Sequence, residues 1–200
     1  MYICKKNKKQ IMKLFLLLFL TLNSLLLSAQ SHFTFKGIPM DGRISTFVEK
    51  MKSKGYIVVK KTEDAYIMKG SFARKDAKIF IISTPQTKTV FRVAVLIEPV
   101  EYTWKSLKNL YLDFRHYYVE KYGNPSSDYN FLAFPYNEGE GNEMQAVEEE
   151  KCRYCCFFFP EEGAISISIS KFKNIEIVYE DNINVEKKKS ESLSMIYDDI

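Results

Sequence analysis

The sequence predicts an α+β protein in which one or more antiparallel sheets are packed by helices. Three observations predict this class. Two segments, near 44–54 and 103–122, repeat apolar residues with the period of a helix. Eight short segments are rich in β-branched and aromatic residues, and most connections between them are too short for a parallel crossover. Helical and strand-like segments also follow the same order in each half of the chain.

The first 29 residues are predicted to be a signal peptide. Five lysines precede an apolar run at 14–27, and Ser28, Ala29 and Gln30 follow it, which favours cleavage after Ala29. The run is shorter than the roughly 20 residues of a spanning helix, so an uncleaved anchor is the less favoured alternative. Cys4 precedes the run, whereas a lipoprotein cysteine follows it. We therefore expect an exported protein, periplasmic or secreted, with a single mature domain at 30–200.

Cleavage changes the charge of the chain. The signal segment holds five of the 29 basic residues and none of the 25 acidic ones, so the mature chain carries 24 basic and 25 acidic residues. The pI of about 8.7 is therefore largely a property of the signal segment. We expect no nucleic-acid partner and no integral membrane span after cleavage.

The first half contains one helix and four strands. Ile44, Phe47, Val48 and Met51 are spaced for one helix face, Asp41 is predicted to cap this helix, and Gly55 to end it. A turn at 36–42 precedes it. The predicted strands lie at 56–60, 65–72, 78–84 and 89–97.

The second half repeats this order. Thr103 is predicted to cap a helix that Gly123 ends. The apolar arc of this helix consists of Trp104, Leu107, Leu110, Tyr111, Phe114, Tyr117, Tyr118 and Tyr122. Strands are predicted at 128–134, 152–159, 163–171 and 174–179, with an acidic segment at 137–151, a short helix at 144–150, and a terminal helix at 183–197 whose lysines 187–189 are solvated.

Two arrangements fit this order. One is a tandem α-β4 repeat with structural halves at 33–99 and 100–200, in which Gly55 and Gly123 are equivalent. The other is one continuous sheet with the helices on one face.

The cysteines Cys152, Cys155 and Cys156 form the only cluster with a metal or redox spacing. A redox pair works at a helix N-terminus, and a zinc site needs a second pair of ligands, whereas this cluster opens an apolar strand. On a strand, Cys152 and Cys156 share one face and Cys155 takes the other. Structural packing is the favoured interpretation and an occasional disulfide the alternative. We predict no cofactor and no metal.

No catalytic set is apparent. Only His32 and His116 are available; His32 is expected to be mobile near the new N-terminus, and His116 to lie on the surface. The glycines lack the spacing of a phosphate-binding loop. The acidic segment lacks the ligand order of a calcium loop and is interpreted as a mobile acidic loop. Its glutamates are Glu138, Glu140, Glu143, Glu148, Glu149 and Glu150. No catalytic, cofactor-binding or metal residue is assigned, and the substrate-binding residues are unknown.

Three motifs carry a resemblance. They are Phe-Lys-Gly-Ile-Pro-Met-Asp-Gly at 35–42, Glu-Lys-Tyr-Gly-Asn-Pro at 120–125 and Ile-Tyr-Asp-Asp-Ile at 196–200. With the export junction, they resemble a group of small uncharacterised exported proteins of gut Bacteroidetes, which implies export and a similar fold but no functional residues. The element order is also similar to that of the two-repeat beta-lactamase inhibitory proteins, a likeness of architecture alone.

The sequence favours a non-enzymatic binding or interaction module of the cell envelope over an enzyme. A nearly neutral exported domain with many Phe and Tyr residues has the side chains that are enriched at protein contacts. The expected partner is an envelope or extracellular macromolecule, protein or glycan. The alternative is a carboxylate-based hydrolase such as a glycosidase, which needs two suitably spaced carboxyl groups, for example Glu98 and Glu101.

Overall fold

The computed structural model describes residues 31–200, within which His32–Ile200 forms one compact unit. This unit contains four helices, an eight-stranded sheet and a two-stranded sheet, which confirms the predicted α+β class. The predicted signal peptide at 1–29 lies outside the described residues. Within 31–200, no helix combines the length and the apolar character that a membrane crossing requires.

The elements run along the chain as two successive groups, each with a helix before four strands of the large sheet. The first group follows a small hairpin, and a last helix closes the chain. In order they are β1 (Thr34–Phe35), β2 (Ile38–Pro39), α2 (Ile44–Ser53), β3 (Ile57–Lys61), β4 (Ala65–Phe72), β5 (Lys75–Ser83), β6 (Val90–Ile97), α3 (Trp104–Tyr122), β7 (Ser127–Leu132), α4 (Glu143–Glu148), β8 (Cys152–Phe158), β9 (Gly163–Ile169), β10 (Ile175–Asp181) and α5 (Asn182–Asp198).

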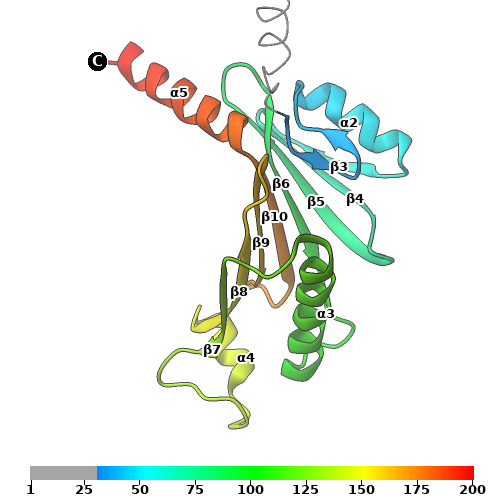
Figure 1. The fold of residues 1–200 in the computed structure, drawn as a ribbon, viewed down its shortest axis with the longest axis vertical. Coiled ribbons are helices and arrows are strands. Elements are labelled where there is room, and N and C mark those ends of the chain that lie inside the picture. Colours follow the sequence, from blue (N-terminus) through cyan, green and yellow to red (C-terminus); the bar gives the residue numbers. More distant parts are fainter. Residues whose placement is uncertain (1–30) are drawn as a thin grey trace, which may run out of the picture. The chain divides into compact units, whose positions relative to one another are not determined.

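The large sheet is antiparallel and has the strand order β3-β4-β5-β6-β10-β9-β8-β7. Each group of four strands is a meander, and the two meanders meet where β6 pairs with β10, in the register Ile97 opposite Ile175 (Figure 1). The two arrangements left open by the sequence therefore occur together. Two α-β4 groups build one continuous sheet, and β3 and β7 form its two edges.

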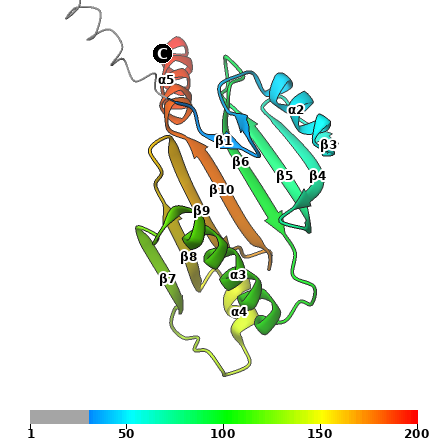
Figure 2. The ribbon, with the colours of Figure 1, turned by 45° about the vertical axis from the view of Figure 1, so that its right-hand side comes forward.

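One face of this sheet carries the core. A row of residues across five neighbouring strands is fully buried there, and α2 and α3 both lie over this face (Figure 2). Along α3, Tyr111 packs edge-on against Tyr154 of β8, and Phe114 stacks near Phe72 of β4. The fully buried row is Ile79, Val95, Ile177, Ile167 and Cys156.

The helices follow the predicted apolar pattern, with two differences. All four predicted apolar residues of α2 are buried, but Arg43 rather than Asp41 precedes the helix, and no side chain within 31–200 caps it. Thr103 caps α3 as predicted, since its side chain accepts a hydrogen bond from the Ser106 N–H. Tyr117, at the margin of the predicted arc, is half-exposed because the arc is wider than the sheet surface beneath the helix.

The segment before α2 and the turn between β4 and β5 differ in part from the prediction. The segment at 36–42 contains the predicted turn, at Lys36 and Gly37, but this turn joins a small hairpin in which Ile38–Pro39 pairs with Thr34–Phe35. Strand β5 begins at Lys75, three residues earlier than predicted. Ala73 and Arg74 both have positive φ, 48° and 62°, so these two residues make the whole turn between β4 and β5.

The terminal helix α5 is held by polar contacts. Asp181 caps it, Asn184 donates hydrogen bonds to the carbonyls of Met40 and Val90, and Glu191 accepts from the turn between β5 and β6. Lys187 donates to the Thr89 hydroxyl, so the expectation that the 187–189 lysines are all solvated is wrong for this one. Beyond Ser192 the helix is exposed (Figure 1).

Candidate functional site

The candidate site is the sheet face opposite α2 and α3, which we call the open face. Opposed residues in an antiparallel sheet point to the same side, so the register of the strands defines this face. Its central row is Lys78, Leu96, Glu176, Ser168, Cys155 and Tyr129. The neighbouring row is Ile67, Phe80, Ala94, Val178, Ser166 and Phe157. Most of these side chains are partly or largely accessible, in contrast to the buried row on the other face.

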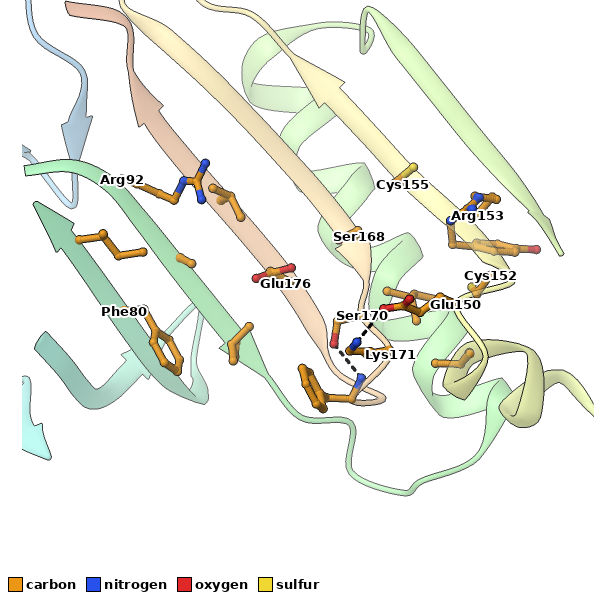
Figure 3. Close-up of a pocket in the computed structure, with 18 residues that line it drawn as sticks. Phe80, Arg92, Glu150, Cys152, Arg153, Cys155, Ser168, Ser170, Lys171 and Glu176 are labelled. Carbon is orange, nitrogen blue, oxygen red and sulfur yellow. Dashed lines mark hydrogen bonds and ion pairs between the residues drawn. The ribbon is translucent and has the colours of Figure 1, made fainter. Parts of the chain in front are cut away.

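Part of the open face is hollowed to a volume of about 700 Å³. Its floor comes from strands β5, β6, β10, β9 and β8, and the turn between β9 and β10 forms one wall with Lys171 and Phe172. Figure 3 shows Arg92, Glu176 and Ser168 rising from three of these strands into the same space. A hollow of this size, lined by both apolar and polar side chains, suits a protruding side chain or a short segment of a partner.

Charges around the hollow are mostly paired within the chain. Arg92 bonds Glu180, with Nε 2.7 Å from Oε1, and Lys171 lies 2.8 Å from Glu150. The side chains of Glu176 and Arg153 are different, because within residues 31–200 neither side chain forms a hydrogen bond or a close ion pair. Both charges remain available for a ligand on the open face.

The three cysteines are placed as their spacing on a strand predicts. Cys156 is buried on the helix face, opposite Ile167, and Cys155 lies on the open face, opposite Ser168. All three are free thiols. Burial raises the pKa of Cys152 to about 12 and that of Cys156 to about 11, and it also raises the pKa of Cys155. These groups are therefore protonated near neutral pH and are poor nucleophiles.

Glu98 and Glu150 do not have the raised pKa of a glycosidase acid. Glu98 accepts hydrogen bonds from Lys78, at 2.9 Å, and from the Tyr102 hydroxyl, and these contacts lower its pKa. Glu101 is exposed and lines no part of the hollow. The ion pair with Lys171 likewise lowers the pKa of Glu150. A general acid needs a raised pKa, so both shifts have the opposite sign.

The acidic segment is more ordered than expected. Glu143 is buried and accepts a hydrogen bond of 2.6 Å from the Gly139 N–H. Glu138 pairs with Lys108, and Glu148 with Lys173. The interpretation of 137–151 as a mobile acidic loop is therefore wrong for these three glutamates. Glu143 accepts a backbone hydrogen bond, and Glu138 and Glu148 bind lysines outside the segment. In the described residues, no three His, Cys, Asp or Glu side chains are grouped to hold a metal ion.

Neither histidine belongs to the open face. His116 is exposed on α3, 3.3 Å from Glu120, as expected of a surface residue. His32 is not free: its Nδ1 lies 3.0 Å from Oδ2 of the fully buried Asp181, which also accepts from the Phe33 N–H at 2.7 Å. The expectation of a mobile His32 is wrong because His32 and the neighbouring Phe33 both contact Asp181, the cap of α5.

Sequence reasoning did not identify the open-face residues Arg92, Glu176 and Arg153. Each is a charged residue on the same face of its strand as Ser168 of β9, where the other face of the strand is mostly apolar. The alternation of side chains along each strand could have assigned these residues to the polar face of that strand. It could not have shown which strands are neighbours in the sheet. Arg92 and Glu176 are 84 residues apart in the sequence, and they lie on neighbouring strands because β6 pairs with β10.

Comparison of the chain with protein-family models, with curated proteins and with solved structures finds no match. The likeness in element order to the beta-lactamase inhibitory proteins is thus accompanied by no matching structure, and no role is transferred from it.

Proposed function

We propose that the protein is an exported, non-enzymatic binding module that contacts a macromolecule of the cell envelope or its surroundings through the open face. The observation that carries the proposal is an eight-stranded sheet with one face under α2 and α3 and the other left accessible. Isolated accessible apolar residues are common, but a continuous patch of them on one sheet face marks an interaction surface.

The composition of the open face supports a macromolecular ligand. Half-buried Phe80, Val178 and Phe157 provide apolar contact area, while Glu176 and Arg153 provide one unpaired charge of each sign. Interfaces combine a central apolar and aromatic area with polar groups around it. The raised thiol pKa values and the lowered Glu98 and Glu150 pKa values add support, because these thiols are not activated as thiolate nucleophiles and these two carboxyl groups are not tuned as general acids.

The test is a capture experiment with the immobilised chain from Gln30 onward, using envelope proteins and envelope glycans as separate inputs. The binding variant carries the charge reversals Glu176→Lys and Arg153→Glu on the open face. The matched control carries Lys105→Glu and Glu120→Lys, two exposed residues of α3 on the opposite side. We expect the control to retain the same ligand as the original chain and the binding variant to lose it.

Two results would contradict the proposal. One is the absence of any ligand above background from both inputs. The other is equal retention by the two variants, which would place the contact elsewhere. In either case the carboxylate hydrolase becomes the hypothesis to test, by measuring release of reducing sugars from envelope glycans.

A further inference from the structure

The two edges of the large sheet are unequal. An edge strand exposes unpaired backbone groups and can add a strand from another chain unless it is protected. At one edge, β3 is protected: its pairing with β4 is broken by a bulge between Val58 and Lys60, and it ends in Lys60 and Lys61. Bulges and lysines are the usual features that prevent edge-to-edge association.

The other edge, β7, lacks this protection. Its six residues contain no lysine, arginine or proline, and its register with β8 is regular from end to end. Tyr129 and Phe131 point to the open face and are 47% and 50% exposed. The one charge, Asp128, points to the helix face, where Arg115 pairs with it. Figure 2 shows β7 as the outermost strand on its side of the sheet.

The hydrogen-bond pattern identifies the backbone groups that face outward. Ala133, which continues the register beyond β7, donates its N–H to the Lys151 carbonyl at 2.7 Å. In an antiparallel pair, opposed residues alternate between exchanging two hydrogen bonds and exchanging none. Residues of odd number in β7 are thus bonded to β8. The N–H and C=O groups of Asp128, Asn130 and Leu132 point away from the sheet.

We propose that the β7 edge pairs with β7 of a second copy of this chain, in the antiparallel register that places Asn130 opposite Asn130 on a two-fold axis. Asp128 of each copy then lies opposite Leu132 of the other. All three outward-facing residues form pairs that exchange two hydrogen bonds, so every free group of the strand is satisfied. The same register places Tyr129 of each copy beside Phe131 of the other, on the open face.

Self-complementarity is the reason for choosing a second copy as the occupant. The register opposes Asp128 to an apolar residue and never to its own copy, so no like charges meet. It brings the two half-exposed aromatic residues of each strand into closely spaced cross-strand pairs, which stabilise sheets. A closed two-fold contact of this kind uses both β7 edges and leaves the protected β3 edges outside. It also joins the two open faces into one surface.

The contact is expected to be weak and reversible. It is built on one pair of six-residue strands, which is less than the roughly 1,600 Å² that stable complexes bury. We therefore expect a dissociation constant on the order of 10 µM. Sedimentation velocity of the chain from Gln30 onward, which contains the whole compact unit, measures it between about 1 and about 500 µM.

The key variant is Asn130→Pro. Proline removes the outward N–H at the two-fold axis, which loses two intermolecular bonds at once, and leaves the β8 ladder intact because that N–H does not take part in it. We expect the dissociation constant to rise by about tenfold or more. Asn130→Ala is the matched control, since it removes the side-chain contact with Asp128 but keeps the N–H, and it should dimerise normally. Val59→Lys, on the β3 edge, should also have no effect.

A mixing experiment tests the register without proline. Tyr129→Lys and Phe131→Glu should each weaken the dimer about tenfold. An equimolar mixture of the two variants should recover it, because the introduced lysine of one copy then lies opposite the introduced glutamate of the other.

Three outcomes decide the proposal. The proposal is overturned if the original chain is a monomer at every concentration. It is also overturned if Val59→Lys disrupts the dimer, because the contact would then involve the β3 edge. Failure of the mixture to recover the dimer overturns the register even if Asn130→Pro does not fold. None of these outcomes depends on an envelope ligand, so the proposed function is judged separately.

Discussion

The buried cap of α5 allows a stability prediction to be worked out from its contacts. Asp181 is fully buried and uses both carboxylate oxygens. Oδ1 accepts from the Asn184 N–H at 2.8 Å, and Oδ2 accepts from the Phe33 N–H at 2.7 Å and lies 3.0 Å from His32 Nδ1. Asp181→Ala therefore removes a helix cap and also leaves the buried Phe33 N–H without its acceptor.

These two losses set the magnitude. Loss of an N-cap costs about 1 kcal/mol, and a buried group deprived of a charged hydrogen-bond partner costs about 1–3 kcal/mol. We expect Asp181→Ala to lower the free energy of unfolding by about 2–4 kcal/mol. The chain contains its own control in Thr103, the exposed cap of α3, which accepts a single hydrogen bond of 3.2 Å from Ser106. Thr103→Ala should cost about 1 kcal/mol.

Urea denaturation measures the loss of unfolding free energy in Asp181→Ala and in Thr103→Ala. The two losses can be compared if the variants have the same m-value as the original chain. Asp181→Asn should fall between the original chain and Asp181→Ala, because its one carbonyl oxygen can still accept. His32→Ala isolates the third contact and should cost least of the Asp181 set, since His32 is partly exposed. The reasoning fails if Asp181→Ala costs no more than Thr103→Ala, which would mean that burial of the cap adds nothing.

Three further predictions concern the core, pH and a close contact. Phe114→Ala should cost about 3–5 kcal/mol in urea denaturation because this ring is buried against the sheet, and a loss under about 1 kcal/mol would place it in solvent. Burial raises the pKa of Glu191, but hydrogen bonds from Thr87 and Gln86 outweigh this and lower it, so its stabilisation holds above about pH 4.3 and is lost on acidification. The stability difference between the original chain and Glu191→Gln should shrink towards pH 3, and a constant difference would contradict this. Gly70→Ala should lower the melting temperature because a Cβ there would lie 2.4 Å from the Tyr56 ring, and an unchanged melting temperature would show that the ring moves freely.

Much of the local structure was predictable from the sequence. The spacing of Ile44, Phe47, Val48 and Met51 located α2, and the alternation of isoleucine and serine located β9 and its buried side. Such patterns can be recognised in a sequence because side chains return to the same face every 3.6 residues in a helix and every 2 residues in a strand. Boundaries were less accurate where turn geometry decided them, as at Ala73 and Arg74, whose positive φ values carry no glycine signal.

The candidate site was not predictable in the same way. Arg92, Glu176 and Arg153 come from three strands, and nothing in the local pattern of any one strand connects it with the others. The contact of His32 with Asp181 spans 149 residues, so a residue near the predicted N-terminus looked free although it is bonded to the helix cap. Contacts between residues so far apart in the sequence form only when all strands of the sheet have paired.

The sequence by itself determined the class of fold, the order of its elements and which side of most strands is buried, because these depend on periodicity within single segments. Only the tertiary structure decided that β6 pairs with β10, and three consequences follow from that pairing. It merges two meanders into one sheet, leaves the face opposite α2 and α3 accessible, and makes β3 and β7 the edges. Strand pairing across such distances is set by how the helices and both meanders bury one common face, a property of the whole chain rather than of any segment.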